Sequence, residues 1–243
     1  MIAQEVPAQD ATAPNAASLA LLLQLADSSF PSGGFTISWG LEGMVATGEV
    51  AGEAGVGGFV TEQLHRRWAS FDRVVAHLVA AALASNDPGT RVAEVLELDE
   101  LVEAMSLPPL QREASRAAGR TFLASAATVV GGELDAMRQS LDAAHAARHL
   151  TIVHPLVFLL VGARLGDAEL ISGMQLIQQL ATAALRLGVI GHLGAQRVIA
   201  AGRVELETIV AAPPVDLRPA QFVPWAEMAM YRQPMLATRM FRC

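Results

Sequence analysis

Apolar residues recur every three or four positions along most of the chain, the spacing that places them on one face of an α-helix. The clearest stripe lies in the predicted helix 166–187 and consists of Leu170, Met174, Ile177, Ala181 and Ala184. The same spacing predicts helices over 18–26, 36–47, 53–69, 71–85, 88–105, 110–130, 133–149, 155–165, 192–202 and 225–236, with 53–85 forming either two helices or one bent helix. Because strands and helices do not alternate, the sequence predicts an all-α, single-domain bundle of about nine or ten helices.

Several helix boundaries follow from residues with strong local preferences. Asp87 followed by Pro88 is typical of an N-cap residue with proline in the first helical turn. Pro155 is expected to start a new helix, because proline is poorly tolerated inside one. Residues 204–210 alternate weakly and fit either a strand or a helix.

Two groups of glycines stand out between the predicted helices. The Gly55–Gly58 segment is expected to form a close contact between helices, because residues without large side chains allow backbones to approach. Gly188, Gly191 and Gly194 recur every three residues and predict either close helix packing or a helix-to-helix turn.

The composition divides the chain into three parts. Residues 1–17 are rich in Ala, Pro and Gln without periodicity and are expected to form a disordered N-terminal tail. Residues 18–210 hold the helical domain. Residues 211–243 begin with a proline-rich stretch that is expected to be extended, and they end in a predicted partner-binding tail.

The overall composition favours helices and limits the location of the protein. Apolar residues make up 52% and aromatic residues only 5% of the 243 positions. The longest apolar runs are shorter than the ~18 residues that a membrane span needs, so no membrane association is expected. Glu5 and Asp10 precede any basic residue, which argues against a signal peptide, and we expect a cytoplasmic protein. The mean hydropathy of +0.37 predicts an apolar surface of the kind that binds other proteins.

The charged residues exclude several classes of function. All 17 basic side chains are arginines, so the chain has no lysine for a P-loop or a Schiff base. The net charge is −7, which opposes nucleic-acid binding because phosphate neutralisation needs a dense basic surface. No nucleic-acid partner and no nucleotide site of the P-loop type are therefore expected.

Catalytic and metal-binding patterns are weak. Ser32-Gly-Gly lacks the G-x-S-x-G elbow of serine hydrolases. His145 and His149 are four residues apart on a predicted helix, but Arg148 beside them opposes cation binding, so ordinary surface histidines are expected. The single cysteine, Cys243, is the last residue, so the sequence offers no evident cage for a transition metal. We therefore predict no catalytic residue, no metal site and no cofactor.

A row of arginines follows an acidic helix in the middle of the chain. Arg112, Arg116 and Arg120 are spaced four residues apart, and the preceding predicted helix carries Glu94 and Glu103. Because the intervening link is short, the two helices are expected to be antiparallel neighbours, with Glu103 facing Arg112 and Glu94 near Arg120. The alternative is a basic stripe that binds a partner.

The C-terminal end concentrates aromatic residues and arginines. Its aromatic residues are Phe222, Trp225, Tyr231 and Phe241, interleaved with Arg232, Arg239 and Arg242. This combination is typical of the residues that dominate binding energy at protein interfaces. The alternative is a tail that folds back onto the core of its own chain.

Four segments together resemble the UreF family of urease accessory proteins. The most specific is Pro31–Glu42, which is similar to Pro-x-Gly-x-aromatic-x-x-Ser-x-Gly-Leu-Glu. The others are Arg112–Gly119, similar to Arg-x-x-Ser-x-x-x-Gly, His154-Pro155, and Arg239–Arg242, similar to Arg-Leu-Phe-Arg. The chain departs from the family at a few positions, which are Ile37, Gln233, Pro234 and Ala237.

This resemblance implies an all-α, non-catalytic protein that forms a homodimer. It would bind the accessory protein UreD, also called UreH, largely through its C-terminal segment. The pair would then recruit or regulate the GTPase UreG, and the assembly would deliver nickel to apo-urease. Two other hypotheses remain, a helical adaptor for the maturation of another metalloenzyme and an enzyme with a buried site.

The resemblance also implies roles for individual residues. Phe35 is either an exposed anchor for the GTPase or a core residue after a turn, and Ser38 caps or turns the chain. Glu42 is expected to pair with an arginine, either locally or across the interface. Arg239 is expected to complete the recruitment surface because its planar guanidinium bridges oxygen acceptors. The full set of implied partner-binding residues is Phe35, Ser38, Trp39, Glu42, Tyr231, Arg232, Arg239, Phe241 and Arg242.

Overall fold

The computed structural model describes residues 16–33, 37–106, 108–236 and 238–241. Within these residues the chain is helical and contains no strand, so the all-α prediction is confirmed. The helices are α1 (Ala16–Ala26), α2 (Leu41–Ala46), α3 (Gly52–Gln63), α4 (Arg73–Leu83), α5 (Pro88–Met105), α6 (Pro109–Val130), α7 (Gly132–Ala143), α8 (Leu150–Leu160), α9 (Leu165–Arg186), α10 (His192–Val210) and α11 (Pro224–Arg232). A π-helical segment, η2 (Leu64–Asp72), joins α3 to α4, and a 3₁₀ turn, η3 (Gln233–Met235), follows α11.

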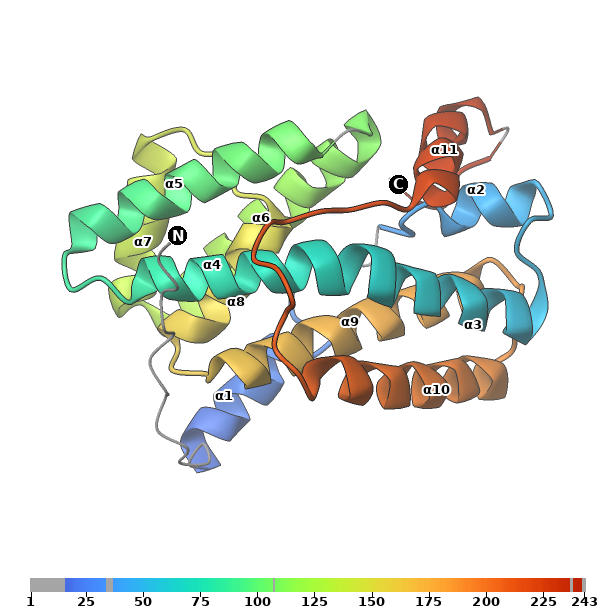
Figure 1. Cartoon of the computed structure of the whole chain (residues 1–243), viewed down its shortest axis with the longest axis horizontal. Helices are drawn as coiled ribbons and strands as arrows, with labels where there is room; N and C mark the ends of the chain where they lie inside the picture. Colours follow the sequence, from blue (N-terminus) through green and yellow to red (C-terminus); the bar gives the residue numbers. More distant parts are fainter. Residues whose placement is uncertain (1–15, 34–36, 107, 237, 242–243) are drawn as a thin grey trace.

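One long rod organises the bundle. It consists of α3, η2 and α4, and it crosses the molecule from one end to the other (Figure 1). Helices α9 and α10 pack against each other on one side of it, α6 packs against α8, and α11 packs against α2. None of the helices in the described part of the chain is long and apolar enough to cross a membrane.

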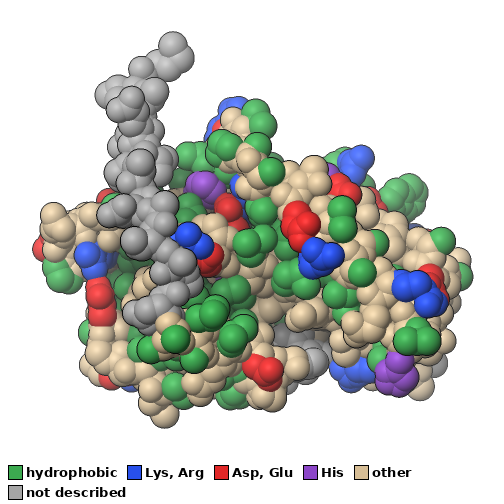
Figure 2. Space-filling model, turned by 90° about the horizontal axis from the view of Figure 1, so that it is seen from below, with side chains coloured by type: hydrophobic (Ala, Val, Ile, Leu, Met, Phe, Trp, Pro, Cys, Tyr) green, Lys and Arg blue, Asp and Glu red, His purple; other side chains and the backbone are tan. Residues whose placement is uncertain are grey.

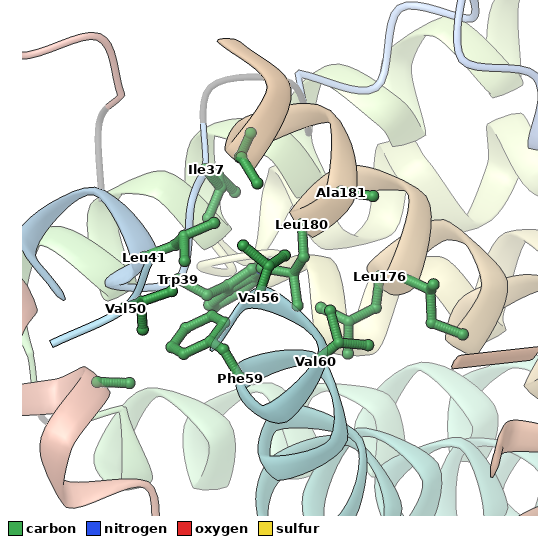
Figure 3. Close-up of a cluster of buried hydrophobic side chains, with 14 of the residues drawn as sticks. Ile37, Trp39, Leu41, Val50, Val56, Phe59, Val60, Leu176, Leu180 and Ala181 are labelled. Carbon is green, nitrogen blue, oxygen red and sulfur yellow. The ribbon is translucent and has the colours of Figure 1, made fainter. Parts of the chain in front are cut away.

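The apolar residues bury themselves in two clusters. One cluster joins α2, α3, α9, α10 and α11 around Trp39 and Trp68, and Figure 3 shows part of it. The other cluster contains residues of α1 and of each helix from α4 through α8, and it is centred on Phe71, Phe122 and Phe158. Because Trp68 and Phe71 both belong to η2, the π-helical segment contributes to both cores and connects the two halves of the bundle.

The π-helical segment also anchors the chain that leads to α11. Figure 1 shows the segment between α10 and α11 running extended across the central rod. Its backbone N–H groups at Ala220 and Phe222 donate to the carbonyl oxygens of Ser70 and Arg66, at 2.9 and 3.0 Å. Carbonyl groups freed by the irregular helix therefore fix this segment, which positions α11.

Three predicted helices differ from the structure, each for an identifiable reason. Helix 36–47 was expected, but α2 begins at Leu41, because Trp39 and Gly40 have positive φ angles of 55° and 87°. The helix predicted over 133–149 ends at Ala143, because His145 and Arg148 also adopt positive φ angles. Pro155 lies inside α8 instead of starting a helix, since most of this helix is buried and its packing outweighs the lost backbone hydrogen bond.

Other sequence predictions are confirmed. Asp87 caps α5, with its carboxylate accepting the backbone N–H of Thr90 at 2.7 Å. Gly188 has the positive φ of a turn between α9 and α10. The choice between strand and helix left open at 204–210 is resolved as helix, because α10 continues to Val210, beyond the predicted end at 202. Gly194 packs directly against Glu53, as expected for close packing.

The predictions for the Gly55–Gly58 segment and for the arginine row were wrong in detail. A Cβ atom added at Gly57 or Gly58 would meet no neighbour within 4 Å, so these glycines form no tight contact. Glu103 pairs with Arg116 and not with Arg112. The reason is that α5 packs mainly against α4, α7 and α8 and does not lie along α6.

Candidate functional site

Helix α11 rests on α2 through residues with small side chains. A Cβ atom added at Gly43 would lie 2.8 Å from the carbonyl oxygen of Ala229, and one at Gly40 would overlap the carbonyl oxygen of Ala226. The two helices therefore touch backbone to backbone, which only glycine permits at these positions. The family-like Trp-Gly-Leu-Glu sequence at 39–42 is thus the seat on which α11 lies.

The outer face of α11 is apolar and exposed. Its large side chains, together with those just before and after the helix, form an apolar stripe that consists of Phe222, Trp225, Met228, Tyr231 and Met235. The exposed fractions of Trp225 and Tyr231 are 59% and 53%. Large aromatic residues left exposed on one helix of a folded chain are typical of a surface that another protein covers.

Arginines flank this stripe. Arg232 is exposed and lies 3.4 Å from Glu49, a distance at which an exposed ion pair contributes little to stability. Arg239 is exposed as well. Exposed arginines can donate hydrogen bonds to the carboxylate or carbonyl oxygens of a partner.

The last described residues fold back onto the chain instead of extending into solvent. Phe241 is buried in the first core cluster, and the guanidinium carbon of Arg186 lies 4.5 Å from the centre of its ring. The Glu42 carboxylate accepts the backbone N–H groups of Met240 and Phe241, at 2.6 and 3.3 Å. The alternative of a tail that folds back onto its own core therefore holds for Phe241, while Trp225 and Tyr231 stay exposed.

The loop residues implied as partner contacts are buried in this chain. Ser38 lies with its hydroxyl oxygen 3.4 Å from the backbone nitrogen of Glu42. The indole N–H of Trp39 donates to the Gln179 side chain at 3.4 Å, and the Arg67 guanidinium stacks on its ring. The structure thus gives these side chains contacts that support the seat of α11. Phe35 and Arg242 lie outside the described residues.

The Arg112–Gly119 motif holds the connection between α7 and α8. The Ser115 hydroxyl accepts the backbone N–H of Leu150 at 3.1 Å, and a Cβ atom on Gly119 would overlap the carbonyl oxygen of Arg148. His149, predicted to be a surface residue, is fully buried here. The spacing of Ser115 and Gly119, one helical turn apart, was the sequence signal for this contact.

Ser115, His149 and Glu103 are connected in the order of a catalytic triad. His149 Nδ1 lies 3.1 Å from the Ser115 hydroxyl, and its Nε2 lies 2.7 Å from the Glu103 carboxylate. However, Ser115 and His149 are almost inaccessible to solvent, and neither lines a cavity in the described residues. Burial lowers the pKa of His149, which keeps the ring neutral. We therefore assign this network to stability and not to nucleophilic chemistry.

A cavity of about 140 Å³ is lined by residues of both core clusters. Asp72 in its wall pairs with Arg67 at 2.8 Å, and burial raises the pKa of the Asp72 carboxyl group. His154 in its wall is buried between Phe122 and Phe158, and burial lowers its pKa to about 4. The cavity is partly open and not enclosed. Its shifted pKa values nevertheless match part of what the hypothesis of a buried enzyme site predicts, so geometry by itself does not separate that hypothesis from a binding protein.

Two further features bear on the class of function. The residues that the structure describes contain no group of three or more histidine, cysteine or acidic side chains able to hold a metal ion. Apolar side chains are also exposed away from α11, as on the face shown in Figure 2, where they lie among acidic and basic residues. Leu23 of α1 and Leu193 of α10 are two exposed apolar residues that lie outside α11.

Comparison with known proteins decides the class. A sequence model of the UreF family matches residues 50–202. The urease accessory protein UreF of Trichodesmium erythraeum (strain IMS101) is 27% identical over 228 residues, which cover 90% of this chain and 94% of that protein. The UreF of Methylobacterium sp. (strain 4-46) is 33% identical over 200 residues, covering 79% and 73% of the two chains. The matched regions include the seat of α11, the central rod and α6 to α10, and the chain therefore belongs to the UreF family of urease accessory proteins, which are non-enzymatic chaperones.

Proposed function

We propose that this chain is a scaffold for nickel insertion into apo-urease. It binds the accessory protein UreD, also called UreH, through the apolar stripe of α11 and the C-terminal segment. The resulting pair recruits the GTPase UreG and regulates it, and nickel passes through the assembly as cargo. The observation that carries this proposal is that α11 is fixed on its inner face by α2 and exposes Trp225 and Tyr231 on its outer face.

The geometry of α11 suits a binding surface because it is already in place. Its inner residues Ala226, Ala229 and Met230 are buried against the core. Binding therefore does not have to order the helix first, which would reduce affinity. Covering Trp225 or Tyr231 would contribute roughly 1.5–3 kcal/mol each if the partner removes the ring from water.

Exchange of these aromatic residues tests the proposal. We expect Trp225→Ala and Tyr231→Ala each to weaken binding of purified UreD at least tenfold in isothermal titration calorimetry, because aromatic residues at the centre of interfaces are worth about 2 kcal/mol or more. The matched control is Leu193→Ala on α10, an exposed apolar residue outside the stripe, which should bind as the wild type does. Unchanged affinity in both aromatic variants would refute the assignment of this surface.

The loop Pro31–Glu42 is proposed to help recruit UreG. Phe35 is the residue that we expect to contact the GTPase, and Arg239 completes the surface from the C-terminal segment. Phe35→Ala should leave UreD binding intact and reduce co-purification of UreG with the pair. If Phe35→Ala recruits UreG normally, this loop has another role.

The family resemblance also leads us to propose that the chain acts as a homodimer in the cytoplasm. Light scattering after size-exclusion chromatography measures this directly, and a monomer at all concentrations would refute it. Failure of the full-length chain to bind any urease accessory protein would favour the other hypothesis, an adaptor for a different metalloenzyme.

A further inference from the structure

The Glu42 carboxylate is buried in the described structure, with an exposed fraction of 4%. No arginine or histidine pairs with it among the described residues, although an arginine partner was expected from the sequence. A buried carboxylate is unfavourable unless its oxygens accept hydrogen bonds. The donors that satisfy Glu42 therefore identify what this residue does.

Among the described residues, the donors to the side chain all come from the C-terminal segment. Met240 donates its backbone N–H to Oε1 at 2.6 Å, and Phe241 donates its backbone N–H to Oε2 at 3.3 Å. Gln233 donates its side-chain amide both to Oε2, at 2.6 Å, and to the carbonyl oxygen of Phe241, at 3.2 Å. One carboxylate thus holds the start and the end of the segment that follows α11.

The attachment leaves the side chains around it available. Glu42 holds residues 240 and 241 by their backbone, so the contact does not use the side chains of Arg239 and Met240, which are both exposed. The Phe241 ring points into the core and fixes the direction of the segment. The backbone anchor therefore determines where the exposed side chains of Arg239 and Met240 are presented.

We propose that Glu42 is a positioning residue for the partner-binding surface: it acts by holding the C-terminal segment so that Arg239 and Met240 face the partner, and it does not contact the partner itself. This inference rests on the proposed function, because it assumes that the stripe and the C-terminal segment bind UreD. Within the described chain, three hydrogen bonds from neutral groups stand in place of the local ion pair with an arginine that was one expectation.

The first test is Glu42→Gln in the full-length chain. The amide keeps one acceptor oxygen but directs an NH₂ group at backbone N–H donors, so the segment should detach. We expect faster hydrogen exchange at the amides of Met240 and Phe241, a single cooperative unfolding transition that shows the helical bundle still folds, and at least tenfold weaker UreD binding. The matched control is Glu113→Gln, the same chemical change at an exposed position of α6.

A double-mutant cycle separates positioning from general damage to the fold. Arg239→Ala combined with Met240→Ala removes the side chains that Glu42 is proposed to present. If Glu42 acts through them, Glu42→Gln should cause little further loss of affinity in that background. Gln233→Met breaks the same anchor from the other side, and it should reproduce the faster exchange and the weaker binding if Glu42→Gln does not fold.

The possible failures can be distinguished. If the alanine pair and Trp225→Ala both bind UreD as the wild type does, the proposed surface is wrong. If these variants lose affinity but Glu42→Gln does not, the surface stands and the positioning role is refuted. Additive losses in the double-mutant cycle would also refute it, because they would show that Glu42 affects binding by a separate route.

Discussion

The buried histidine of α8 makes the stability of the fold depend on pH. Burial lowers the pKa of His154 from the model-peptide value of 6.5 to about 4, so the ring is neutral in the folded chain at pH 7. Its Nε2–H donates to the Gln175 side chain at 2.7 Å, and the Gln175 amide donates in turn to the carbonyl oxygen of Ala26 at 3.1 Å, which fixes this arrangement. Within the described residues no charged group pairs with the ring.

The sign and the magnitude follow from proton linkage. Below pH 6.5 the unfolded chain binds a proton at this histidine that the folded chain does not bind, so acidification favours unfolding. Each pH unit between 6.5 and about 4 costs about 1.4 kcal/mol. Between pH 7 and pH 5, His154 alone should therefore lower the free energy of unfolding by about 2 kcal/mol.

The assay is urea unfolding at pH 7 and at pH 5, followed by circular dichroism. Replacement of the ring in His154→Gln costs some stability at both pH values but removes the titration. The difference in unfolding free energy between the two pH values should therefore be about 2 kcal/mol smaller than in the wild type. Leu193→Ala, a change without a titratable group at an exposed position, is the control and should keep the wild-type difference. An undiminished pH dependence in His154→Gln would refute the reasoning.

Further predictions concern packing and capping. Gly119→Ala should lower the free energy of unfolding by about 1–3 kcal/mol in urea titration, because the new methyl group would overlap the carbonyl oxygen of Arg148. Gly57→Ala is the same change at a position where a Cβ atom meets no neighbour, and it should instead raise the free energy of unfolding by about 0.5–1 kcal/mol. A loss of stability comparable to that of Gly119→Ala would contradict the described packing. Asp87→Ala should lower the free energy of unfolding by about 1 kcal/mol, because the backbone N–H of Thr90 loses its cap, and it should leave UreD binding unchanged. Unchanged stability in thermal unfolding, or weaker UreD binding in calorimetry, would contradict this assignment.

Local sequence patterns were sufficient where neighbours in sequence make the contact. Asp87 caps α5 as predicted, because the donor is the backbone three residues away. Periodicity located α6 and α9 to within a residue or two, since each helix has one face in the core. The same rules failed at Pro155, where burial of the surrounding apolar side chains outweighs a local preference.

The candidate surface was found only in part from the sequence. Aromatic residues interleaved with arginines marked the C-terminal end, but the pattern did not separate the exposed Trp225 and Tyr231 from the buried Phe241. The separation depends on which face of α11 meets α2. That choice depends on Gly40 and Gly43, which are far away in the sequence.

The sequence by itself determined the helical class, most helix boundaries, the absence of lysine-dependent chemistry and the resemblance to UreF, because each depends on residue identity or on spacing within a few turns. Tertiary structure alone decided the role of Glu42, whose donors lie nearly two hundred positions later in the chain. The physical reason is that a buried carboxylate must be satisfied by whatever donors the packed helices bring to it, and no local pattern specifies those donors.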